Sequence, residues 1–369
     1  MNSILRNIFI VILLFTTFLV RSSEHVDQNV KTEGHNQNTE IDIKKIILHH
    51  VGDAYEWHIT KIGTEDLSIP LPVILYSKIS GWHLFLSSRL HEKSGYQGMS
   101  LAHEGKYEGK IVETNEAGQQ IRPFDISLTK NAVSLIIAAI LIIALFMSVA
   151  KSFKRNGYVP GSKFVVLMEI LLTDIYENVV KSSLGDNYKK FAPYLITLFF
   201  YIFINNLIGI VPLFPGGANV TGNIAVTFVL AAVTFLIVNV KGSKEYWKEI
   251  LWPDVPWWLK FPLPIMPLIE LTGIFMKPFA LMIRLFANIL AGHSVILSLT
   301  CVIFVTVKMG FAVNSGMTLL AIVFSVFLGL IEFLVAYIQA YVFTLLTAIF
   351  ISLARIEHKP LEHKPLEHK

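Results

Sequence analysis

The spacing of apolar and polar residues separates a mixed N-terminal part of the chain from a strongly apolar remainder. Strand-like alternation occurs in IDIKKIILHH (residues 41–50), IPLPVILYSKISGWHLFLSS (69–88) and KYEGKIVE (106–113). Glycine, asparagine and aspartate residues, which favour turns, separate these stretches. The pattern therefore predicts a small β-rich region over residues 23–129.

The first residues are typical of a segment that directs export. An apolar run from Ile8 to Val20 follows a single basic residue and is too short for an ordinary membrane span. We interpret residues 1–22 as a signal peptide. An uncleaved anchor stays the alternative, because Arg21 lies where a cleavage site needs small residues. Either interpretation sends the β-rich region out of the cytoplasm.

Beyond Lys130 the chain consists largely of apolar stretches of membrane-spanning length. The last two are longer than a perpendicular crossing requires, which predicts strong tilt or bending. Between the first two, residues 162–184 alternate with helical period, so we expect an amphipathic helix along the membrane surface. The predicted membrane-embedded helices cover residues 132–150, 191–211, 221–240, 267–313 and 317–354.

The charges that flank the first span predict the orientation of the chain. Lys151, Lys154 and Arg155 place its C-terminal end in the cytoplasm by the positive-inside rule. Residues 23–129 are then periplasmic, as the signal peptide also indicates. Residues 130–354 form the membrane domain, and the repetitive tail of residues 355–369, rich in Glu, His, Lys and Pro, is expected to be disordered in the cytoplasm.

Composition supports an all-α polytopic membrane protein with an external β-rich extension. Hydrophobic residues make up 53% of the chain and charged residues 16%, with a mean hydropathy of +0.57. The net charge of +4 is too small to suggest nucleic-acid binding. A single cysteine excludes an internal disulfide, and no metal site or cofactor is predicted. His49 and His50 fit a solvated strand face better than a metal site, since no ligand spacing repeats.

Enzyme motifs are missing from the sequence. It contains no GxxxxGK[ST] loop for phosphates, no HExxH zinc motif and no GxSxG nucleophile elbow. We therefore predict no catalytic site within this chain.

Ionisable residues in the last two apolar regions are few, and they are the strongest indication of function. A charge at the bilayer centre costs about 2.5–3.5 kcal/mol on insertion scales, so such residues are candidates for a functional site. They are Glu270, Lys277, Arg284, His293, Lys308 and Glu332.

The spacing of these residues predicts two polar faces. Glu270, Lys277 and Arg284 recur every seven residues, and Asn288 lies one turn beyond Arg284, so the four share a helix face. His293 follows Arg284 by nine residues, which turns it about half a rotation away. We expect the arginine and the histidine to face different surroundings.

The final apolar region supplies candidate partners for both faces. Glu332 and Gln339 are seven residues apart and share a face. A tilted hairpin would turn Arg284 and Gln339 toward one surface and bring His293 and Glu332 together in a polar cleft. Each residue has a plainer interpretation, because membrane amides commonly join helices and a lone histidine is often only packed. Arg284 by itself is equally compatible with an ion pair to Glu270, and Lys277 with a snorkelling side chain.

The ordered combination of motifs resembles the a subunit of F-type ATP synthases, the membrane stator of a rotary motor. The resemblance covers residues 132–353 and includes a glutamate and a lysine upstream of the arginine, corresponding to Glu270 and Lys277. Its motifs are GSKFVVLMEILLTDIY (161–176), NLIGIVP (206–212), RLFANILAGH (284–293) and IEFLVAYIQAYVFTLLTAIF (331–350).

The resemblance implies a role for each matching residue. Arg284 corresponds to the essential arginine of the family, Asn288 to its neighbouring amide and Gln339 to the glutamine on the last helix. Many bacterial members carry a glutamate after the RLF motif and a histidine on the final helix. Here His293 and Glu332 are exchanged, which resembles the mitochondrial form. Because either helix can supply either partner, we expect the pair to relay protons.

The implied function is proton translocation through two half-channels that do not join. Arginine stays protonated at physiological pH, so Arg284 would attract an ionised rotor carboxylate and block direct proton passage. Asn206 and Asn223 either line an aqueous entrance or satisfy broken helix ends. The implied partners are the rotor c-ring, the stator b subunits, the rest of the complex and membrane lipid, in a bacterial inner membrane. A secondary transporter, an ion channel and a structural scaffold remain the alternatives.

Overall fold

The computed structural model describes residues 52–355, apart from 63–64, 79, 92–95, 103–106, 108, 115–119, 158–161, 212–216 and 253–264. The predicted signal peptide, the histidine pair and the tail beyond residue 355 lie outside the described residues. The chain divides into two compact units. The first comprises the chain up to Leu141, Ile204–Asn223 and Asn288–Ala336, and the second comprises Ile142–Phe203, Ile224–Ala287 and the chain from Tyr337.

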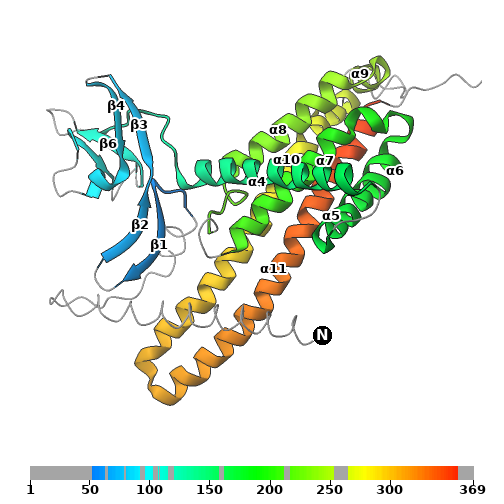
Figure 1. Cartoon of the computed structure of the whole chain (residues 1–369). Helices are drawn as coiled ribbons and strands as arrows, with labels where there is room; N and C mark the ends of the chain where they lie inside the picture. Colours follow the sequence, from blue (N-terminus) through cyan, green and yellow to red (C-terminus); the bar gives the residue numbers. More distant parts are fainter. Residues whose placement is uncertain are drawn as a thin grey trace, which may run out of the picture. The chain divides into compact units, whose positions relative to one another are not determined.

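The described N-terminal part is a small β-rich region, as predicted (Figure 1). It contains three antiparallel sheets, with strand orders β1-β2, β4-β3-β8 and β5-β6-β7. The predicted stretch at residues 69–88 contains β3 and β4, and KYEGKIVE overlaps β6. The alternating pattern did not predict the other described strands. The strands are β1 (Glu56–Ile62), β2 (Glu65–Pro70), β3 (Pro72–Ser77), β4 (Gly81–Leu86), β5 (Met99–Leu101), β6 (Ile111–Thr114), β7 (Gln120–Ile121) and β8 (Phe124–Asp125).

One face of β3 supplies the centre of this region. Val73 and Leu75 are fully buried, because alternate residues of a strand point to the same side. They belong to one hydrophobic cluster with Phe85 of β4 and Ile111 of β6. Tyr55 closes the cluster, and its hydroxyl donates a hydrogen bond to the Asp125 carboxylate of β8. This bond ties the segment before β1 to the last strand before the membrane helices.

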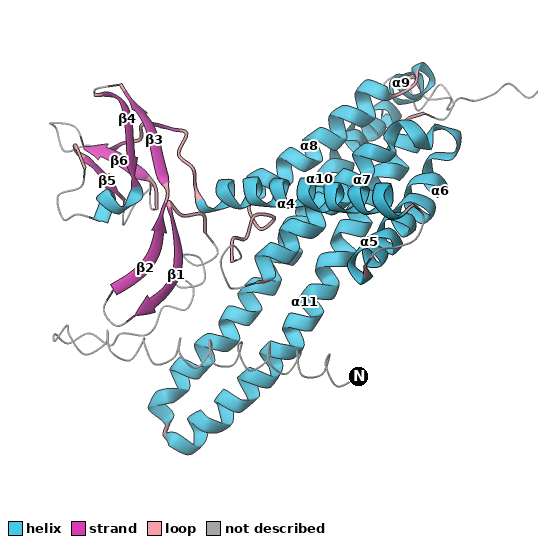
Figure 2. Ribbon diagram, viewed as in Figure 1, coloured by secondary structure: helices cyan, strands magenta, loops and turns pink. Residues whose placement is uncertain are grey.

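The rest of the described chain is helical, and five helices are long and apolar enough to cross a membrane (Figure 2). Their positions agree with the five predicted membrane-embedded helices. They are α4 (Lys130–Asn156), α7 (Tyr188–Ile210), α8 (Ile224–Lys241), α10 (Ile265–Thr306) and α11 (Phe311–Leu353).

The predicted amphipathic helix is also present. It consists of α5 (Lys163–Asp174), a π-helical segment (Ile175–Lys181) and α6 (Ser182–Leu184). Ser162 caps its start, with the Val165 backbone N–H donating to the serine hydroxyl. A short helix that the apolar pattern did not indicate, α9 (Lys244–Leu251), follows α8. The backbone N–H of Ser243, its N-cap, donates to the Ala354 carbonyl and so joins α9 to the end of α11.

Helices α10 and α11 have 42 and 43 residues. At 1.5 Å per residue each is about 63 Å long, roughly twice the thickness of a hydrocarbon core. Their length therefore fits the predicted tilt. Their boundary was predicted too late, at residues 313–317, because the apolar pattern continues through the turn. The turn instead covers Val307–Gly310, where Gly310 adopts a φ of +100 that other residues rarely tolerate.

The Tyr55 hydroxyl predicts how the β-rich region responds to alkaline pH. Burial, together with the Asp125 carboxylate, raises the pKa of the Tyr55 phenol above its ordinary value near 10. The folded state therefore holds this proton more tightly than the unfolded state. The resulting stability is complete below a pH of about 10 and declines as the pH rises from there toward the folded pKa.

We expect the urea midpoint of this region to fall between a pH of about 9 and about 11 in the full chain. Pulse proteolysis of the detergent-solubilised protein measures the midpoint. Tyr55→Phe should show a smaller fall over the same interval, since it removes the titrating group. An equal fall in both proteins would contradict the assignment.

Candidate functional site

In the first unit, the predicted histidine and glutamate do meet. His293 of α10 and Glu332 of α11 lie with Nδ1 and Oε1 2.5 Å apart, a contact that becomes an ion pair when the histidine is protonated. Their side chains are 17% and 6% exposed, so the pair is largely removed from the surface of the chain. A carboxylate in such a place is stabilised by a neighbouring proton donor. The pair thus joins α10 and α11 through two polar side chains inside an apolar part of the chain.

Two glycines lie beside this pair. A Cβ atom on Gly292 of α10 would lie 3.0 Å from Glu332 Oε1, so a larger residue there would require the carboxylate to shift. On the other side of the ring, a Cβ on Gly209 of α7 would lie 3.7 Å from His293 Nε2. The two ring nitrogens thus face different helices, α11 through Nδ1 and α7 through Nε2.

Asn206 fastens α7 to α11 beside the pair. Its side-chain amide donates to the Ala336 carbonyl of α11 at 3.3 Å, and its side-chain oxygen accepts from the Thr221 hydroxyl at 2.7 Å. Asn206 and Thr221 are each 1% exposed. Asn206 is one turn before Gly209 in α7, and Ala336 is one turn after Glu332 in α11. The amide therefore holds together the two helices that flank the histidine ring.

The loop before α8 adds polar groups that sequence analysis did not select. Besides Thr221, it contains Asn219, whose side-chain oxygen accepts from the Gly222 backbone N–H at 2.9 Å. The backbone N–H of Asn223 donates to the Val220 carbonyl, and its side chain is half-buried. The density of polar residues in NVTGN between two spans could have indicated this cluster. The backbone bond of Asn223 lies just before the start of α8, and the two roles considered for this residue, lining an aqueous entrance or satisfying a helix end, stay predictions.

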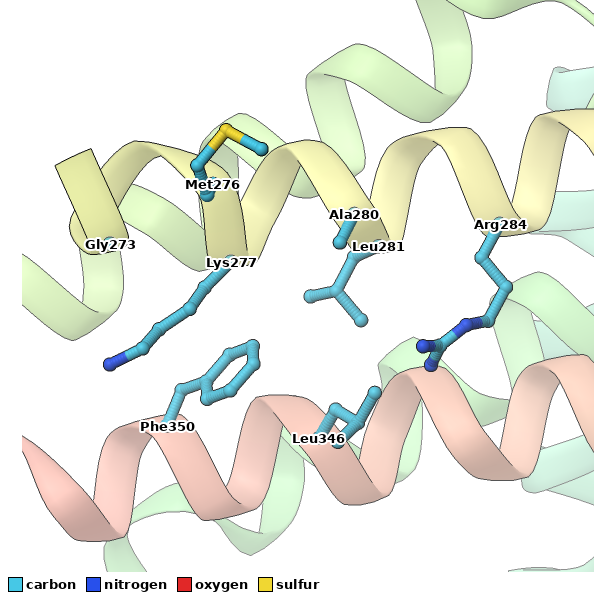
Figure 3. Close-up of a pocket in the computed structure, with 8 residues that line it drawn as sticks. All are labelled: Gly273, Met276, Lys277, Ala280, Leu281, Arg284, Leu346 and Phe350. Atoms are coloured by element: carbon cyan, nitrogen blue, oxygen red, sulfur yellow. The ribbon is translucent and has the colours of Figure 1, made fainter.

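In the second unit, Arg284 and Lys277 line one groove between α10 and α11 (Figure 3). Both side chains reach from α10 toward α11, so the predicted common face of these two cations is confirmed. Apart from the two cations, the lining consists of Gly273, Met276, Ala280, Leu281, Leu346 and Phe350. Lys277 Nζ lies 5.8 Å from the centre of the Phe350 ring, which is within the range of a cation–π contact.

Arg284 is exposed on α10, and no carboxylate among the described residues lies within ion-pair distance of it. The alternative of an ion pair with Glu270 is therefore wrong for this chain by itself. Glu270 lies instead near α9, where burial and the charge of Glu270 raise the pKa of the Tyr246 phenol. A cation that is exposed on an apolar helix needs a partner from outside the chain or access to water.

The amides predicted to accompany Arg284 are placed differently. Gln339 of α11 is 8% exposed and is not among the residues that line the groove. The expectation that Arg284 and Gln339 turn toward one surface stays a prediction. Asn288 is exposed and follows Arg284 by one turn of α10.

Acidic residues of the amphipathic helix divide between two environments. Glu177 pairs with Lys181 at 2.8 Å, and both are about half exposed, as expected for a solvated face. Asp174 departs from that expectation, because its carboxylate accepts a hydrogen bond from the Tyr337 hydroxyl of α11 at 3.2 Å. The contact joins residues 163 positions apart in sequence, so the spacing within α5 could not predict it.

No group of three or more potential metal ligands occurs among the described residues.

Comparison with known proteins agrees with this arrangement of helices and motifs. The family model described as ATP synthase A chain matches residues 132–352, which is more than half of the chain. The chain belongs to the ATP synthase A chain family. The match to this family covers the region in which the motifs were recognised, and residues 46–131 match a separate domain of unknown function.

Relatives in this family come from several bacteria. ATP synthase subunit a 2 of Chlorobaculum tepidum is 41% identical over 241 residues, covering 64% of this chain and 65% of the relative. ATP synthase subunit a of Chlorobium phaeobacteroides is 38% identical, covering 63% and 66%. ATP synthase subunit a of Myxococcus xanthus is 35% identical, covering 62% and 73%. The chain thus spans slightly less than two thirds of the first two relatives.

The close approach at Gly292 predicts an unusual response to alanine. Replacing a helical glycine by alanine ordinarily stabilises the helix by about 0.5–1 kcal/mol. We expect Gly292→Ala to lose this gain or to destabilise, because the new methyl group must displace the Glu332 carboxylate from His293. Unfolding of the purified chain in mixed micelles measures the change.

Gly329→Ala is the matched control, since a Cβ on Gly329 of α11 would have nothing within 4 Å. This variant should show the ordinary gain. Equal gains in the two variants would mean that the carboxylate has room to move without cost.

Proposed function

We propose that the chain is the proton-translocating stator subunit of an F-type ATP synthase, which couples ion flow to rotation and ATP synthesis. In this proposal it works against a rotor c-ring with mid-membrane carboxylates and is held by stator b subunits. The nucleotide chemistry belongs to other subunits of the complex. Family membership and the five candidate spans support the proposal.

One observation carries it, namely an exposed guanidinium on an apolar membrane helix without a described carboxylate partner. Arginine cannot lose its proton in a protein, so Arg284 cannot carry protons itself. It can attract a carboxylate that passes on another chain, and it can repel a proton that would cross directly. Both effects force protons to travel with the rotor. The apolar lining of the groove strengthens them, because charges interact more strongly where water is excluded.

His293 and Glu332 supply the proton-accepting site of one half-channel in this proposal. Histidine titrates near neutral pH, and a neighbouring carboxylate can share its proton. Asn206 holds α7 against α11 one turn from Glu332, through its bond to the Ala336 carbonyl. The driving force is the pH difference together with the membrane potential, which is worth about 2.3 kcal/mol per charge for each 100 mV.

The proposed orientation places residues 23–129 in the periplasm and the C-terminus in the cytoplasm of a bacterial inner membrane. Basic residues at the end of α4 support it by the positive-inside rule. In this arrangement residues 130–354 form the membrane domain. Gln339, Asn288, Glu270 and Lys277 are then second-rank candidates for the pathway, behind Arg284 and the His293–Glu332 pair.

A secondary transporter or an ion channel is the second candidate function. Such proteins also place charges in membrane helices, but transporters commonly bind substrate between discontinuous helices. Here α10 and α11 are continuous through their charged positions. Transport by the chain without a rotor would favour this alternative.

The first prediction of the proposal concerns Arg284. In the assembled complex, Arg284→Ala should abolish ATP synthesis driven by a proton gradient, because no fixed charge then separates the half-channels. Synthesis in inverted vesicles with an imposed gradient is the measurement. Co-purification with the rotor ring should be retained, which distinguishes lost coupling from lost assembly.

Ile283→Ala provides the control, since Ile283 is also exposed and adjacent to the arginine but carries no charge. It should keep most of the activity. Normal synthesis by the Arg284→Ala complex would refute the stator proposal and favour a scaffold.

The second prediction concerns the pair. His293→Ala should lower ATP-driven proton pumping by roughly tenfold or more, as expected for loss of a proton-transfer group. The double exchange His293→Glu with Glu332→His should recover part of the flux, because the pair would be restored with its members reversed. Fluorescence quenching of a pH dye in vesicles reports the flux.

Ser298→Ala is the control for this helix, because the one bond that the Ser298 hydroxyl makes within the described residues is to the Ser294 carbonyl of its own helix, at 2.7 Å. Its flux should be unchanged. Unaltered pumping by His293→Ala would remove the histidine from the pathway.

A further inference from the structure

The outer face of the β4-β3-β8 sheet is apolar, although the opposite face already supplies the core. An antiparallel sheet with one buried face ordinarily turns polar residues to water on the other. Here Tyr76, Trp82, Leu84, Leu86 and Phe124 are 41%, 65%, 74%, 50% and 65% exposed. A continuous apolar patch of this kind on a folded domain marks a surface that binds something.

Strand register makes these residues one surface, which we call the aromatic face. Tyr76 lies opposite Trp82 on β4 and opposite Phe124 on β8. The Tyr76 and Trp82 rings are 5.1 Å apart between centroids. Two further cross-strand pairs, Ile74 with Leu84 and Pro72 with Leu86, continue the face along the hairpin. It therefore extends along the whole length of β3 and β4, two strands that lie side by side in Figure 1.

Only a very short segment of backbone connects this sheet to α4, the first candidate membrane helix. Past β8, the Ile126 and Leu128 N–H groups still donate to the Ile74 and Pro72 carbonyls of β3, at 3.0 and 3.2 Å. The candidate span of α4 begins at Lys130, only two residues later. Extended chain covers about 3.5 Å per residue, so the sheet cannot move far from the start of that span.

Two more hydrogen bonds restrain the same junction. The Lys130 N–H donates to the Ala54 carbonyl at 2.8 Å, and the Asn131 N–H donates to the Asp53 carboxylate at 3.1 Å. The first turn of α4 is thus bonded to the segment that leads into β1. The β-rich region is therefore held against the start of α4 by its own fold and not by a free linker.

We propose that the aromatic face docks on the lipid interface of the membrane that α4 enters. Tryptophan and tyrosine favour the level of the headgroups, and leucine, isoleucine and phenylalanine favour the boundary with the acyl chains. Lys78 in the β3–β4 turn and Arg122 before β8 are exposed and basic, which suits anionic headgroups. This inference needs only that α4 spans a membrane and is independent of the proton pathway.

Depth-dependent quenching in nanodiscs tests the docking with the full chain. Leu84→Cys in a Cys301→Ser background receives an environment-sensitive fluorophore, since Leu84 is exposed and its replacement leaves the core intact. The nanodiscs contain phosphatidylcholine and phosphatidylglycerol, with or without bromine atoms near the headgroup. We expect bromine to quench the label at least roughly twofold more than at a control site, with little quenching by iodide in the water.

The control label is at Gln120→Cys, an exposed polar position on β7 of a different sheet. It should be quenched by iodide and not by bromolipids. If the Leu84 label behaved like this control, the aromatic face would lie in water and the proposal would be overturned. If neither quencher reached it, a protein would cover the face, either a second copy or another subunit, and the proposal would again fail. A label at Leu86→Cys should repeat the result found at Leu84.

Discussion

The high cost of an ionic group in hydrocarbon determines where this chain keeps its few intramembrane charges. Glu332 is buried against His293, and Lys277 lies over the Phe350 ring. Arg284 is exposed on α10 without a described carboxylate beside it. Glu332 and Lys277 therefore contact other side chains of the same chain. The third charge is compatible with a membrane only if water or another chain meets it, which is the basis of the proposed stator function.

Close helix packing gives the His293–Glu332 pair its geometry. Hydrophobic burial contributes little to helix association in lipid, so small residues and polar contacts determine how closely helices approach. Gly292 leaves the space into which the Glu332 carboxylate fits, and Gly209 lies beside the His293 ring. Asn206 then holds α7 and α11 at this spacing. The chemistry of the pair therefore depends on residues that have no proton chemistry of their own.

The β-rich region also has a surface whose composition fits the neighbourhood of a membrane. Its core uses one face of β3, and the face that remains is apolar next to the point where the chain enters the membrane. On a soluble protein such a surface would favour aggregation. In the proposed docking it contacts lipid, which would give the extension a role separate from the proposed ion conduction.

Length and period of the apolar runs by themselves determined the five membrane helices, the amphipathic helix and the β-rich extension, because these patterns reflect local geometry and water exclusion. Seven-residue spacing likewise put Lys277 and Arg284 on one face. Only the tertiary structure decided which distant groups meet. It joined His293 to Glu332, buried Gln339 and bonded Asp174 to Tyr337. Those contacts depend on how helices far apart in sequence approach each other. The spacing of residues within one helix predicts which residues share a face, but not which helix packs against that face.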